Sequence, residues 1–122
     1  MIIRSLILIP LFLFFLYYAR KDFLYHRSQR KVPAAERLLH GGIGVMIGGM
    51  FLQAILGHSQ LMLLALALFV VMGAADEYVF HRGIPGVESD IHAKEHLALL
   101  IFVVASLVID WIQVPGANAV RL

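Results

Sequence analysis

Long apolar stretches separated by short polar segments make up most of the chain. The apolar stretches cover about residues 2–19, 38–57, 60–80 and 95–113. Each is long enough to cross a bilayer, because a transmembrane helix needs roughly 17 to 25 mostly apolar residues. Short connections between helices favour antiparallel neighbours. The pattern therefore predicts an all-α integral membrane protein, an antiparallel four-helix bundle in which residues 1–122 form a single transmembrane domain.

Residues that begin or end helices set the expected boundaries. Pro33 suits the first turn of the second helix, where its missing N–H donor costs nothing. Ser89 is a suitable N-cap for the fourth helix, because its hydroxyl can accept a hydrogen bond from a backbone N–H of the first turn. We expect helices over about 2–26, 33–56, 60–82 and 89–114, with turn signals at Gly57-His58-Ser59, Gly83-Ile84-Pro85-Gly86 and Pro115-Gly116.

The composition supports a lipid-embedded protein. Hydrophobic residues make up 61% of the chain and charged residues only 15%, and the mean hydropathy is +0.85. A chain of 122 residues cannot bury so much apolar surface in one water-soluble core. Aromatic and charged residues from Phe15 to Lys21 lie where a signal peptide would carry small residues for cleavage, so we expect the first span to be retained.

Basic residues are distributed unevenly between the two sides of the predicted bundle. Arg4 and Arg121 lie at the termini, whereas the other eight of the ten lysines and arginines lie between spans one and two or between spans three and four. Cytoplasmic segments of membrane proteins carry such an excess. We therefore expect four spans with both termini outside, and we expect the basic segments to contact anionic lipid headgroups rather than nucleic acid.

Pairs of an acidic residue and a histidine recur at the inner ends of the predicted helices. Each acid precedes its histidine by four residues, which places both side chains on one helical face. The fourth helix supplies two histidines and a glutamate within its first turns. The candidate metal ligands are Asp22 and His26, Glu36 and His40, Glu77 and His81, and His92 and His96, with Glu95 as a ligand or proton shuttle. We expect these groups to form one mono- or di-metal site facing the cytoplasm.

The remaining acids near this site have secondary predicted roles. Asp76 and Asp90 could bind a metal or orient an imidazole. Glu88 is expected in the loop before the fourth helix. Asp22 and His26 lie on a helix end that protrudes from the membrane, so they are the candidate pair with the greatest expected exposure.

The segment His92-Ala93-Lys94-Glu95-His96 resembles the H-x-x-E-H motif of the inverzincin metallopeptidases. The resemblance covers five residues and implies that His92 and His96 bind a metal and that Glu95 is the general base. Because the chain has no cysteine, thiolate ligands are excluded. Imidazole and carboxylate ligands suit iron, zinc or manganese, and we favour iron.

Several functions are compatible with this pattern. The leading hypothesis is a membrane oxidoreductase, similar to a hydroxylase or desaturase, that acts on a lipid or quinone. A zinc-dependent membrane hydrolase that uses His92, Glu95 and His96 is one alternative. Another is a non-catalytic metal-binding or structural subunit of a membrane complex. A hydrogen-bonded polar belt without metal and haem ligation by a pair of histidines also stay open.

Two further features concern packing and the outer membrane surface. Gly44 and Gly48 lie four residues apart on one face, which predicts close approach of a neighbouring helix and offers a surface for oligomerisation or a membrane partner. Gln53, His58 and Asp110 form a thinner polar group at the outer end. We interpret Asp110, beside Trp111, as an interfacial anchor.

Overall fold

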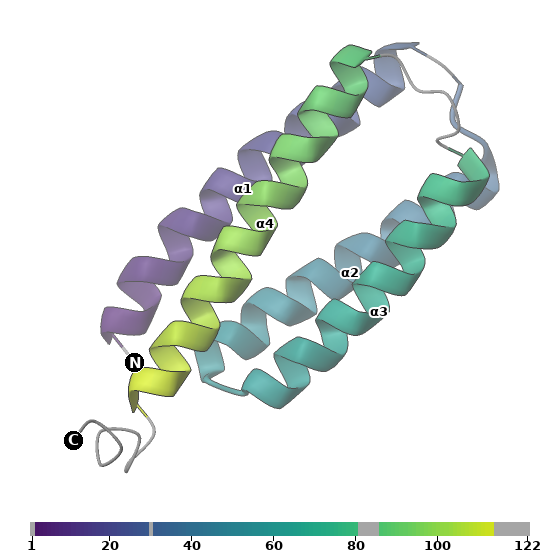
Figure 1. Ribbon diagram of the computed structural model, residues 1–122. Coiled ribbons are helices and arrows are strands. Elements are labelled where there is room, and N and C mark those ends of the chain that lie inside the picture. The colour runs from purple at the N-terminus through teal and green to yellow at the C-terminus, as the bar shows by residue number, and fades with distance from the viewer. Residues whose placement is uncertain (1, 30, 81–85, 114–122) are drawn as a thin grey trace.

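The computed structural model describes residues 2–29, 31–80 and 86–113, which form four helices and, within these ranges, no strand. The helices are α1 (Ile2–Gln29), α2 (Ala34–Leu56), α3 (Ser59–Phe80) and α4 (Gly86–Gln113) (Figure 1). All four are long and apolar enough to cross a membrane. The prediction of an all-α integral membrane protein with an antiparallel four-helix bundle is confirmed.

The helix boundaries agree with most of the expected signals. Pro33 occupies the N-cap of α2, and Gly57 ends α2 in the left-handed conformation with φ 81°. The 28 residues of α1 span roughly 42 Å at 1.5 Å per residue, which exceeds the roughly 30 Å hydrocarbon core of a bilayer. The expected ends of the third helix at 81–82 and of the fourth at 114–116 lie outside the described residues.

The start of the fourth helix differs from the prediction. α4 begins at Gly86, so Ser89 lies inside the helix and is not its N-cap. The earlier start places Glu88 in the first turn rather than in a loop. A carboxylate is favourable there because the backbone N–H groups at a helix N-terminus carry partial positive charge.

The four helices pack as two pairs. α1 lies along α4 and α2 lies along α3, whereas contacts between the pairs are few. The pairs meet near the α2–α3 turn and diverge toward the opposite end (Figure 1). We call these the turn end and the site end, the latter being where α1 and α3 finish and α2 and α4 begin. The antiparallel order therefore brings the C-terminal turns of two helices together with the N-terminal turns of the other two.

Aromatic residues join the two pairs in the half of the bundle toward the turn end. Phe12 of α1 stacks on Phe51 of α2, with ring centroids 4.1 Å apart and an interplanar angle of 15°. Phe12 also lies 5.6 Å from Phe102 of α4. Around these rings, Phe15, Met50 and Phe102 are almost completely buried. The hydrophobic core thus lies away from the site end.

Arg4 forms a polar junction among three helices at the turn end. The buried guanidinium forms an ion pair of 2.5 Å with Asp110 of α4, donates to Ser106 Oγ at 3.4 Å, and donates through Nε to the carbonyl oxygen of Ala54 on α2. A Cβ on Gly57 would lie 3.1 Å from Arg4 Nη1. Asp110 therefore binds a buried arginine, which the interpretation as an interfacial anchor did not anticipate.

Most glycines of α2 do not mediate close helix packing within the chain. A Cβ added at Gly44 or Gly48 would meet no atom within 4 Å, and the same holds for Gly73 on α3. Only Gly42 of the described α2 glycines would contact a neighbour, the side chain of Met72. The predicted close approach at Gly44 and Gly48 is therefore wrong within the chain, because no neighbouring helix reaches these positions. Their use in oligomerisation or partner binding stays a prediction.

Replacing Arg4 tests the polar junction. Arg4→Ala leaves the partly buried Asp110 carboxylate without its ion pair, and breaking a buried pair from one side costs about 3 kcal/mol. We expect a fall in Tm on the order of 10 °C in detergent, measured by thermal unfolding. Arg20→Ala, which removes an exposed arginine from the same helix, serves as the control. Equal Tm values for the two variants would contradict the proposed contribution of the junction.

Candidate functional site

A large cavity separates the two helix pairs toward the site end. Its volume is about 1540 Å³, and all four helices contribute to its lining. Exposed side chains such as Phe23 and Val70 form part of the wall, so the cavity is open to the surroundings. Ionisable groups line the part nearest the helix ends, and apolar residues line the part nearer the middle of the bundle.

His26 of α1 lies at the centre of the most buried set of polar contacts. Its Nε2 is 3.1 Å from Glu36 Oε1, and its Nδ1 is 2.5 Å from Glu88 Oε1. Only 4% of His26 and none of Glu36 is exposed. The expected exposure of His26 is therefore wrong, because α2 and α4 both cover the end of α1 with carboxylates.

His40 connects this set to α3. Its Nε2 lies 3.0 Å from Asp76 Oδ2 and 4.0 Å from Glu36 Oε1, one turn earlier on α2. The rings of His26 and His40 are 5.7 Å apart. Each of His26, Glu36 and His40 offers a ligand atom within 4.8 Å of the others, so these residues form the first candidate metal group.

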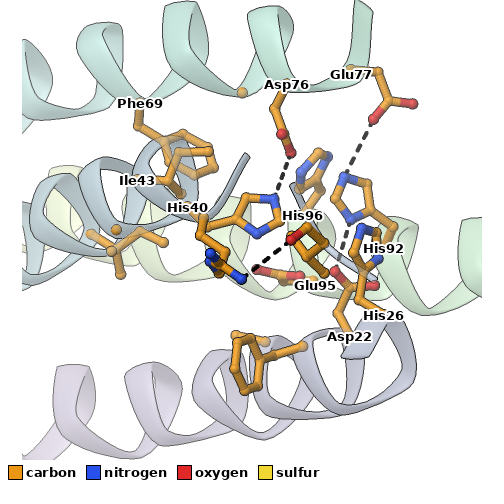
Figure 2. A pocket seen from close by; sticks show the side chains of 18 of the residues that line it. Asp22, His26, His40, Ile43, Phe69, Asp76, Glu77, His92, Glu95 and His96 are labelled. Atoms are coloured by element: carbon orange, nitrogen blue, oxygen red, sulfur yellow. Dashed lines mark hydrogen bonds and ion pairs between the residues drawn. The ribbon is translucent and has the colours of Figure 1, made fainter. Parts of the chain in front are cut away.

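A second group of potential ligands lies beside the first. Asp22, His92 and Glu95 also place ligand atoms within 4.8 Å of one another. His92 Nδ1 is 3.4 Å from Asp22 Oδ2, and His92 Nε2 is 3.6 Å from Glu77 Oε2 on α3. Figure 2 shows Asp76 and Glu77 reaching from α3 toward His40 and His92. All four helices thus contribute to one polar cluster.

The two groups are neighbours because α1 supplies one residue to each. Asp22 and His26 are four residues apart, which corresponds to roughly 6 Å along the helix axis. Asp22 Oδ1 is buried and has no hydrogen-bond partner among the described residues. A buried carboxylate oxygen of this kind is costly unless a cation or a proton satisfies it.

Carboxylates outnumber imidazoles in this cluster. The carboxylates are those of Asp22, Glu36, Asp76, Glu77, Glu88 and Glu95, and the imidazoles are those of His26, His40, His92 and His96. Close carboxylates repel one another in a medium of low dielectric constant. The excess of negative charge makes the cluster suitable for binding cations.

Most predicted ligands lie in the cluster. Asp22, His26, Glu36, His40, Glu77, His92, Glu95 and His96 all contact it or line its cavity. His96 is more peripheral, with its ring 4.4 Å from His92 and 6.4 Å from Phe69. His81 lies outside the described residues. Asp90 is exposed and pairs with Lys94 at 2.5 Å, so it takes no part.

Glu88 is the residue that the sequence analysis missed. It is buried and contacts His26. The available signal was its position four residues before His92, the same acid-to-histidine spacing that occurs on the other helices. The error in the start of the fourth helix concealed this signal by assigning Glu88 to a loop.

Comparison with known proteins identifies no relative of the chain. No protein-family model matches the chain, and searches of curated proteins and of solved structures gave no match. The chemistry of the site is therefore the basis for a function.

Cross-linking of introduced cysteines tests the site geometry, since the chain has no cysteine of its own. We expect a short bis-maleimide to join Asp22→Cys to His92→Cys, because the native side chains are 3.4 Å apart. Asp22→Cys with Asp90→Cys is the matched control, since Asp90 is exposed and lies about 200° around α4 from His92. Mass spectrometry of peptides should give a yield several-fold higher for the first pair, and equal yields would contradict the arrangement.

Proposed function

We propose that the protein is a small membrane metalloprotein that binds one or two transition-metal ions between its helix pairs and acts as an oxidoreductase on a lipid or quinone. The observation that carries the proposal is the buried group of His26, Glu36 and His40 beside the group of Asp22, His92 and Glu95. Two histidine-carboxylate groups one helical turn apart provide enough ligands for two ions.

The ligand chemistry supports a redox metal. Imidazole and carboxylate ligands without thiolates suit iron, manganese or zinc, and we favour iron. Glu88 would act through His26, because it contacts Nδ1 while Nε2 faces Glu36, and a carboxylate bonded to one ring nitrogen fixes the orientation of the ring toward a metal. Asp76 contacts His40 Nε2, the nitrogen that also faces Glu36, so it would help to hold an ion beside His40. Bound cations would also offset the repulsion among the carboxylates.

The reaction we propose is oxidation of a substrate C–H bond. When bound, the metal would supply the redox chemistry. One oxygen atom of dioxygen would convert C–H to C–OH. The second oxygen atom would leave as water, after an electron donor provides two electrons together with two protons. Glu95 lies beside His92 in the cavity and would hold or transfer a proton. The apolar wall of the cavity would hold the substrate and exclude water.

The proposed orientation follows from the basic residues. Arg27, Lys31 and Arg37 lie at the site end, and such an excess of positive charge is typical of a cytoplasmic surface. We therefore propose that the metal site faces the cytoplasm and that both termini face outward.

The hydrolytic alternative receives less support from the geometry. In that scheme His92 and His96 would bind zinc while Glu95 activated water. The second candidate metal group instead contains Glu95 with Asp22 and His92, without His96. Glu95 therefore lies among the potential ligand atoms, which favours a ligand or proton-holding role over that of a separate base.

Elemental analysis of the purified protein tests the proposal. We expect iron in the wild type and loss of the ion of the buried group in His26→Ala and His40→Ala, because each removes a ligand of that group. A second ion held by Asp22, His92 and Glu95 would stay bound. His58→Ala is the matched control, since His58 bonds to Gln53 near the turn end. A metal-free wild type after metal-replete expression would contradict the proposal, and zinc in place of iron would favour hydrolysis.

Asp76→Asn tests the role of the carboxylate that contacts His40. We expect at least a ten-fold loss of metal affinity, measured by competition with a chelator, because the variant loses a carboxylate that contacts the nitrogen of His40 facing Glu36. Asp90→Asn, which neutralises an exposed aspartate paired with Lys94, should leave the affinity unchanged. If both variants bind metal as the wild type does, Asp76 has no role in holding the ion.

A further inference from the structure

The cavity extends beyond the polar cluster into an apolar region that α2 and α3 line. Its walls there include Ile43, Gly44 and Ile47 on α2, with Phe69 and Gly73 on α3. A Cβ at Gly44 or Gly73 would meet no atom within 4 Å. These glycines therefore leave space in the wall instead of bringing two helices together.

Basic side chains line the other side of the polar cluster. Arg27, Lys31 and Arg37 belong to the same cavity wall, and all are exposed. Along α2, Glu36 and Arg37 come first, followed by His40 and then by Gly44 and Ile47. From the site end inward, the cavity thus presents exposed basic side chains next to the buried carboxylate of Glu36, then His40 with the rest of the cluster, and then an apolar region.

This order matches the order of chemical groups in an anionic lipid. We propose that the cavity binds one anionic membrane lipid, with its acidic headgroup at Arg27, Lys31 and Arg37 and a hydrocarbon chain along Gly44 and Gly73. The volume of about 1540 Å³ exceeds the roughly 300–1,000 Å³ of most small-molecule sites, as a lipid requires. The bilayer itself supplies such a ligand at high local concentration.

The exposed basic rim favours this occupant over a quinone or a neutral lipid, because the carboxylate next to it in the sequence, that of Glu36, is buried and paired with His26. Juxtamembrane lysines and arginines each attract anionic lipid by about 1 kcal/mol, whereas an uncharged head gains nothing comparable from the rim. The inference rests on the proposed function for any chemistry that follows binding. Arg37 and His40 are separated by only roughly 4.5 Å along α2. A headgroup at Arg37 would therefore place the nearest carbons of the lipid beside the cluster, and these carbons are the proposed position of reaction.

Native mass spectrometry of detergent-solubilised protein tests lipid binding directly. Phosphatidylglycerol and phosphatidylcholine with identical chains are the probes. We expect the wild type to retain one phosphatidylglycerol per chain and at least ten-fold less phosphatidylcholine. Arg27→Gln combined with Arg37→Gln should abolish this preference. Equal retention of the two lipids by the wild type, or preferential retention of an added quinone, would overturn the inference.

Filling the apolar region provides the second arm of the test. Gly44→Leu should reduce retention of phosphatidylglycerol at least ten-fold, because the side chain would occupy the path of the hydrocarbon chain. Gly48→Leu is the matched control, since it also extends into open space from α2 but does not line the cavity. Circular dichroism and Tm identify variants that fail to fold, and equal loss of lipid in both folded variants would overturn the inference.

Metal content measured on the same samples separates the two proposals. Lipid retention without bound metal would remove the proposed function and leave the lipid site intact. Bound metal with equal retention of both lipids would remove the lipid site and leave the metal site intact. Gly44→Leu should keep the wild-type metal content, because Gly44 supplies no ligand atom.

Discussion

A helix that crosses a bilayer cannot satisfy an ionisable side chain with bulk water, so the polar groups of neighbouring helices must satisfy one another. This constraint explains both ends of the bundle. At the turn end, Arg4 binds groups on α2 and α4. At the site end, His26 is enclosed by the carboxylates of Glu36 and Glu88. In both places polar contacts link α1 to α2 and α4.

The number and length of the helices were predictable because hydrophobic patterning reports directly on the surrounding lipid. The acid-histidine spacing likewise placed each pair on one face, since that relation is local to a helix. Partners across helices were harder to predict. The contact of His26 with Glu88 and the pairing of Arg4 with Asp110 depend on α1 lying beside α4. Strongly apolar helices carry little sequence information about which face meets which neighbour.

The glycines also show that sequence spacing does not identify the neighbour of a helix face. Gly44 and Gly73 have the small side chains that permit close helix packing, yet each faces open space. A missing Cβ gives room either to a neighbouring backbone or to a cavity, and sequence spacing alone does not distinguish these outcomes. Here the two helix pairs diverge, so both glycines lie in the wall of the cavity instead of against a neighbouring helix.

The divergence of the helix pairs has a mechanical consequence. The pairs are joined by Phe12, Phe51 and Arg4 toward one end, while His26 and the α2 residues Glu36 and His40 face each other across the other. An ion held between these residues would link the two helix pairs at the site end, whereas the core contacts join them toward the turn end. Part of the binding free energy of the ion would then fix the separation of the helix pairs. The affinity for the ion would therefore depend on the stiffness of the whole bundle as well as on the ligands.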